Sequence, residues 1–112
     1  MMSFYHFSQN NSGGSFHLDA NLTVNVIIEA NSANEANDKL EMLGGYFDGC
    51  REGRDCTCCG NRWDRTYENE GTDFPSIYLR SLEEFLRSNY MKWFSEGQNV
   101  VVHYADGRKE WH

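Results

Sequence analysis

The feature that most constrains the fold is a long stretch in which apolar and polar residues alternate. Its apolar residues occupy even positions: Phe16, Leu18, Ala20, Leu22, Val24, Val26 and Ile28. Polar residues stand between most of them, at positions 17, 19, 21, 23 and 25. Successive residues of a strand face opposite sides of a sheet, so this pattern predicts a long strand with one buried face and one face toward solvent.

A second strand is predicted immediately upstream, over residues 3–8 (SFYHFS). The polar loop QNNSGG at 9–14 separates it from the alternating stretch. Asn and Gly tolerate the positive φ angles that hairpin loops require. We therefore expect the two strands to form a hairpin.

Two capping boxes predict helices. Ser32 is followed three residues later by Glu35, and Ser81 by Glu84, so hydroxyl and carboxylate can satisfy free N–H groups in each first turn. Helical spacing of apolar residues follows both boxes, at Ala33, Ala36, Leu40 and Leu43 and at Leu82, Phe85, Leu86, Trp93 and Phe94. We expect the first helix to stop at Gly44 and the second to continue to Gly97.

The remaining strands are predicted in the second half of the chain. Residues 74–79 form a short strand, and NVVVHY at 99–104 and KEWH at 109–112 form a hairpin around Asp106-Gly107. The resulting order is β-β-α-loop-β-α-β-β. It predicts a single α+β domain over residues 1–112, with an antiparallel sheet and both helices on one face.

Charge and hydropathy exclude several classes of function. The net charge of −7 argues against direct nucleic-acid binding, which depends on Lys and Arg at phosphates. No apolar run approaches the roughly 20 residues that span a bilayer. The N-terminal residues lack the basic start and apolar core of a secretion signal, so we expect the chain to stay in a reducing cytoplasm.

All four cysteines lie within ten residues, which points to a metal site. Cys56 and Cys59 form a C-x-x-C step followed by Gly60, and Cys50 precedes them by six residues. Such a turn presents two thiolates to one ion, so we expect zinc to bind Cys50, Cys56 and Cys59 and to staple this loop. We expect His17 as the fourth ligand, with Cys58 as the alternative and the other histidines as further choices. Thiols without metal, or a redox pair, are the alternatives.

Four arginines surround the cysteines: Arg51, Arg54, Arg62 and Arg65. They are candidates for an anion-binding patch on an otherwise acidic protein. The alternative is that they offset neighbouring carboxylates and the negative charge of zinc-bound thiolates.

The chain also resembles a known family over nearly its whole length. The segments that carry the resemblance are FSQNNSGGSF at 7–16, YFDGC at 46–50, DCTCCGNRW at 55–63 and VHYADGRKEW at 102–111. It is similar to small uncharacterised proteins encoded mainly by tailed bacteriophages. The resemblance implies a non-virion protein made in the cytoplasm of an infected bacterium, and it assigns no catalytic residues.

Three functions are consistent with these patterns. The first is a non-enzymatic phage accessory protein that binds a host or phage macromolecule, for host takeover or counter-defence such as inhibition of an immune effector. The second is a sponge for a nucleotide-like anion. The third is a thiol-redox or metal-dependent enzyme that uses Cys56 and Cys59.

Overall fold

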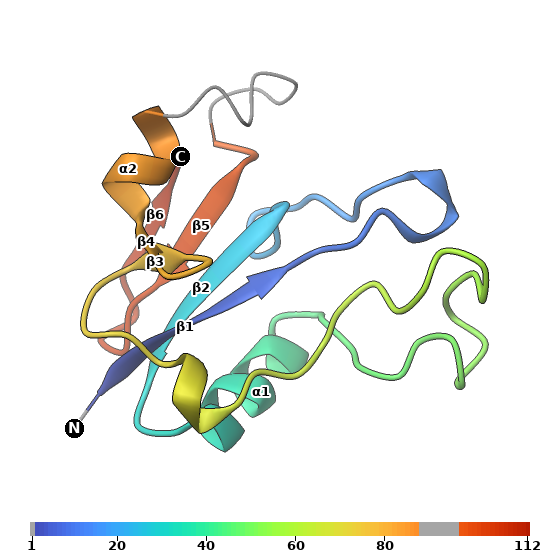
Figure 1. The fold of residues 1–112 in the computed structure, drawn as a ribbon, viewed down its shortest axis with the longest axis horizontal. Helices are drawn as coiled ribbons and strands as arrows, with labels where there is room; N and C mark the ends of the chain where they lie inside the picture. The colour runs from blue at the N-terminus through green and yellow to red at the C-terminus, as the bar shows by residue number, and fades with distance from the viewer. Residues whose placement is uncertain (1, 88–96) are drawn as a thin grey trace.

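The computed structural model describes residues 2–87 and 97–112 and has an α+β fold (Figure 1). Its main sheet has the strand order β1-β2-β5-β6. The strands are β1 (Ser3–Ser8), β2 (Asn25–Ala30), β5 (Val100–His103) and β6 (Lys109–Trp111). The outer pairs β1–β2 and β5–β6 are antiparallel, as expected. The central pair β2–β5 is parallel, because β5 returns to β2 through a long crossover rather than a hairpin.

The strand predicted over residues 16–28 begins later than its pattern indicates, at Asn25. Upstream, the Asp19 carboxylate accepts the N–H groups of Asn21 and Leu22 at 2.8 and 2.9 Å and bends the chain. Leu22 and Val24 are nevertheless buried. The alternation therefore marks side chains that reach the core from a loop as well as from a strand.

The central strand β2 is buried on both faces, contrary to the expectation of one face toward solvent. Val26 and Ile28 pack in one core cluster with α1 (Ala33–Met42). Ile27, between them in sequence, packs in a second cluster with Phe85 of α2 (Leu82–Arg87). Neighbouring strand residues point to opposite faces, so the two helices cover opposite faces of the sheet. The prediction that both helices share one face was wrong, and Figure 1 shows the strands running between them.

Both predicted capping residues bind the first turn of a helix. The Ser32 hydroxyl accepts the N–H of Glu35 at 3.1 Å, and the Ser81 hydroxyl accepts the N–H of Glu84 at 3.2 Å. The chain leaves α1 through Gly44, whose φ of 111° favours glycine. The predicted continuation of the second helix, with Trp93 and Phe94, lies outside the described residues. Over the described ranges, no helix is long and apolar enough to cross a membrane.

A small hairpin stands where one strand was predicted over residues 74–79. It consists of β3 (Ser76–Ile77) and β4 (Arg80–Ser81), which pair antiparallel. Its two turn residues, Tyr78 and Leu79, have φ angles of 50° and 66°. This left-handed region is uncommon for large side chains. Tyr78 is 71% exposed and Leu79 is 77% exposed, so the turn holds two large apolar side chains in solvent.

The buried histidine of β5 predicts a pH dependence of stability. Burial lowers the pKa of His103 below its ordinary value of 6.5, and its Nε2–H donates to the Asn21 carbonyl at 2.8 Å. The unfolded chain therefore takes up a proton first as the pH falls, and stability that is present above pH 6.5 is lost below it. We expect urea titrations to show a free energy of unfolding that falls between pH 7.5 and pH 5.5. The fall should be smaller in His103→Gln, and an equal fall in both proteins would contradict the assignment.

Candidate functional site

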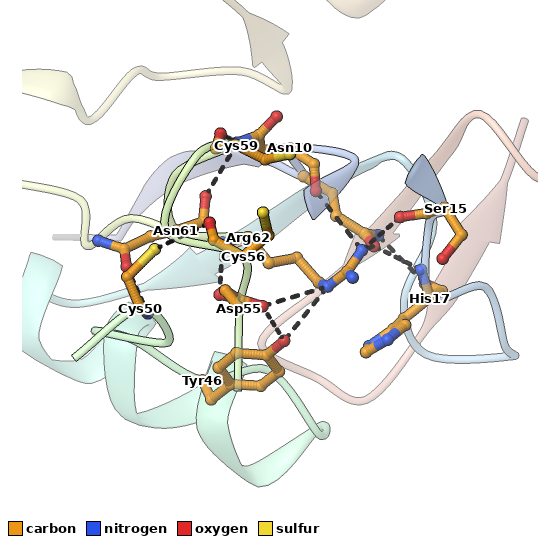
Figure 2. A network of polar contacts seen from close by, with 11 residues as sticks. Asn10, Ser15, His17, Tyr46, Cys50, Asp55, Cys56, Cys59, Asn61 and Arg62 are labelled. Carbon is orange, nitrogen blue, oxygen red and sulfur yellow. Dashed lines mark hydrogen bonds and ion pairs between the residues drawn. The ribbon is translucent and has the colours of Figure 1, made fainter. Parts of the chain in front are cut away.

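The guanidinium of Arg62 joins two long loops that extend from the same end of the sheet (Figures 1 and 2). Arg62 is buried, and its Nη1 donates to the Ser15 carbonyl at 2.6 Å and to the Gln9 side chain at 3.2 Å. Its Nε donates to the Tyr46 hydroxyl at 3.2 Å. One side chain thus holds the loop after β1 against the loop after α1.

Asp55 supplies the negative charge that this buried cation requires. Its carboxylate lies 3.8 Å from Arg62 Nε, and it also accepts the Arg62 backbone N–H at 2.7 Å. The Tyr46 hydroxyl donates to it at 2.6 Å. Burial, followed by the bond to Asp55, raises the pKa of Tyr46. A Cβ at Gly49 would lie 1.8 Å from the carboxylate, so only glycine fits beside it.

Gln9 fixes the path of the loop between β1 and β2. Its amide is buried, and it accepts the N–H of His17 at 2.5 Å while donating to the carbonyls of His17 and Thr23 at 3.1 and 3.2 Å. The same side-chain oxygen accepts from Arg62. Gln9 therefore transmits the position of Arg62 to residues far along its own loop.

Asn10 joins the same loop to the cysteines. Its backbone N–H donates to the Arg62 carbonyl at 2.8 Å, and its side chain donates to the Cys59 carbonyl at 2.7 Å. Nearby, the Asn61 side chain accepts the N–H of Cys50 at 2.9 Å. The motifs QNN, YFDGC and DCTCCGNRW thus meet in one hydrogen-bonded network (Figure 2).

The cysteines are free thiols, of which Cys50 is half-buried and the other three are exposed. The N–H groups of Cys59 and Cys58 donate to Cys56 and lower the pKa of its thiol. Burial, together with the charges of Asp55, Cys56 and Cys59, raises the pKa of Cys50. Within residues 2–87 and 97–112, no three His, Cys, Asp or Glu side chains are arranged to hold a metal ion.

The two candidates for a fourth ligand lie in different places. Cys58 is exposed within the C-x-x-C turn. His17 is exposed beside the Tyr46 ring, 6.4 Å between centroids. In Figure 2 it lies across the Arg62 guanidinium from Cys50. The structure therefore does not bring His17 together with Cys50.

The four arginines that were predicted to form an anion-binding patch each contact other residues of the chain. Arg62 is buried in the network above. Arg51 and Arg65 both pair with Asp48, at 3.4 and 2.9 Å. Arg54 lies 4.9 Å from the centroid of the Tyr46 ring. These contacts fit the charge-offsetting interpretation.

An open groove of about 930 Å³ runs along β1, and sequence reasoning did not find it. One side is formed by the turn residues Tyr78 and Leu79. The opposite side is polar and is formed by Asn61, Asp64, Arg65, Asn69 and Glu70. The groove joins segments far apart in sequence, so only the apolar pair after Ser76-Ile77 could have signalled it.

One known protein family matches nearly the whole chain. The family described as Domain of unknown function (DUF7296) matches residues 2–112. The chain belongs to this family. No curated protein and no solved structure is significantly similar to it.

We predict that the Arg62 network dominates the stability of the two loops. Arg62→Met leaves the buried Asp55 charge without its cation, and loss of one partner of a buried pair costs about 3–5 kcal/mol. Urea unfolding should show this loss. The control Arg51→Ala removes an exposed cation and should change the free energy of unfolding by less than about 0.5 kcal/mol. A similar small change in Arg62→Met would contradict the role of the network.

Proposed function

We propose that this protein acts by binding a host or phage macromolecule and that it catalyses no reaction. The observation that carries the proposal is the groove along β1 with Tyr78 and Leu79 held exposed at its rim. Large apolar side chains in solvent are costly, and clustered ones mark interaction sites. Aromatic anchors also contribute strongly to protein interfaces.

The backbone at this rim supports the same conclusion. Tyr78 and Leu79 adopt left-handed φ angles that Asn and Gly would adopt with less strain. A turn selected for stability alone would favour those smaller residues. Two large apolar residues here are explained by a contact outside the chain.

The resemblance to phage-encoded proteins supplies the setting of the proposal. A protein made in the cytoplasm of an infected bacterium meets host enzymes and host immune effectors. We therefore propose host takeover or counter-defence as the use of the binding site. The nucleotide-sponge alternative has less support, because Arg62, Arg51 and Arg65 are each bound to protein carboxylates.

Capture from infected cells tests this proposal. Tagged wild-type protein should recover one stoichiometric protein partner. The double variant Tyr78→Asn, Leu79→Gly keeps a favourable turn but removes both apolar side chains, so it should lose that partner. The control Met42→Ser, at an exposed residue of α1, should retain it. Recovery of a nucleotide from the denatured protein, with no protein partner, would favour the sponge instead.

We also propose that Cys50, Cys56 and Cys59 bind zinc and staple the loop. Cys56, Cys59 and Gly60 form a tight turn in which the N–H groups of Cys59 and Gly60 donate to the Cys56 carbonyl at 3.2 and 3.1 Å. Gly60 has a φ of 91°. The lowered pKa of Cys56 favours the thiolate that zinc requires. Metal would draw the three thiols closer than they lie, with Cys58 or water as the fourth ligand.

Native mass spectrometry of protein purified without chelators should show one zinc per chain. Cys56→Ser should lose the metal and lower the melting temperature more than Cys58→Ser does. Thiols that are metal-free and rapidly alkylated in the wild type would contradict the zinc proposal. That result would favour thiol-redox chemistry at Cys56 and Cys59.

A further inference from the structure

The edge strand β1 leaves backbone groups open inside the groove. Gln9 donates its N–H to Val24 on the β2 side, whereas Phe4 and Asn10 pair on the other side, with Thr72 and Arg62. Backbone groups of successive strand residues point to alternate edges, so His6 and Ser8 also point away from β2. Among the described residues, neither has a backbone partner on this outer edge.

The unpaired stretch of the β1 edge at His6 and Ser8, called the opening below, is bounded at both ends. The Phe4–Thr72 bridge has N···O distances of 2.8 and 3.0 Å, and Asn10 donates to Arg62 at 2.8 Å. Between these contacts the chain bows away from β1, and the groove occupies the space. A short row of unpaired N–H and C=O groups thus lies between two fixed contacts, which is a template for an added strand.

The two sides of the opening differ in chemistry. Tyr78 packs on the His6 ring with centroids 4.9 Å apart, so the side of the groove near β3 and β4 is apolar. On the other side, Asp64 and Glu70 are acidic, while Arg65 is paired with Asp48. An occupant with basic residues on one face and apolar residues on the other matches both sides.

We infer that the groove binds an extended, basic segment of a partner protein by β-strand addition to His6 and Ser8. Main-chain hydrogen bonds to these residues fix the segment, and its alternating side chains meet Tyr78 and Leu79 on one side and the acidic side on the other. This inference rests on the proposed function and specifies the kind of partner and how it binds.

A matched pair of variants tests the backbone contact. Ser8→Pro removes the outward N–H, and proline is tolerated where an edge strand faces solvent. Ser8→Ala removes the same hydroxyl but retains the N–H. The probe is a capped five-residue peptide in which valine alternates with lysine, titrated by calorimetry at low salt. We expect Ser8→Ala to bind like the wild type and Ser8→Pro to bind at least about tenfold more weakly.

Modified probes test the geometry without changing the protein. In an extended peptide the backbone N–H groups of all lysines face one edge of the strand, and those of all valines face the other edge. N-methylation of one set should abolish binding, and methylation of the other set should leave it intact. Equal effects of the two modifications, equal binding by Ser8→Pro and Ser8→Ala, or no binding of the lysine peptide at millimolar concentration would overturn strand addition.

Two further experiments test the preference for a basic partner and distinguish a failure of strand addition from a failure of the proposed function. A peptide with glutamate in place of lysine should bind more weakly, and equal affinity would overturn the preference for a basic partner. If infected cells yield a partner that the Tyr78→Asn, Leu79→Gly variant loses and that Ser8→Pro still binds as well as the wild type, strand addition fails while the proposed function stands. If no partner is recovered, the proposed function itself fails.

Discussion

The rest of this structure depends on one buried cation. Arg62 lies in the interior between two loops that contain no regular strand or long helix, and a charge in such a place needs a full set of acceptors. Asp55, Tyr46, Gln9 and the carbonyl of Ser15 provide them. The loops therefore take their path from the guanidinium as well as from the apolar side chains that they bury in the core, Phe47 and Trp63 among them.

This constraint explains the spacing of the sequence motifs. Gly49 is small so that the Asp55 carboxylate can approach, and Gln9 and Asn10 occupy the first residues after β1 so that they reach Arg62 and Cys59. The segments QNN, YFDGC and DCTCCGNRW thus describe a structural network beside the groove. The apolar rim of the groove comes from residues outside those motifs.

Local signals in the sequence predicted local structure well. Ser32 with Glu35 marked the start of α1, residues 3–8 marked β1, and Asp106-Gly107 marked the last hairpin, because each signal acts within a few residues. The cysteines and arginines were recognised as a cluster, but their partners were not. Whether Arg62 faces solvent or reaches Gln9 and Ser15 depends on how two distant loops meet, and no spacing encodes that. The opposite placement of the helices was missed although Val26, Ile27 and Ile28 form a continuous apolar run, which is typical of a strand buried on both faces.

Asn10 contacts both the segment that lies beside β1 and the cysteine turn. Its main chain closes one end of the opening beside β1, and its side-chain amide holds the carbonyl of Cys59. If metal binds the cysteines and a partner segment binds this edge, the two sites are coupled through Asn10. By thermodynamic reciprocity, each would then change the affinity of the other by the same factor.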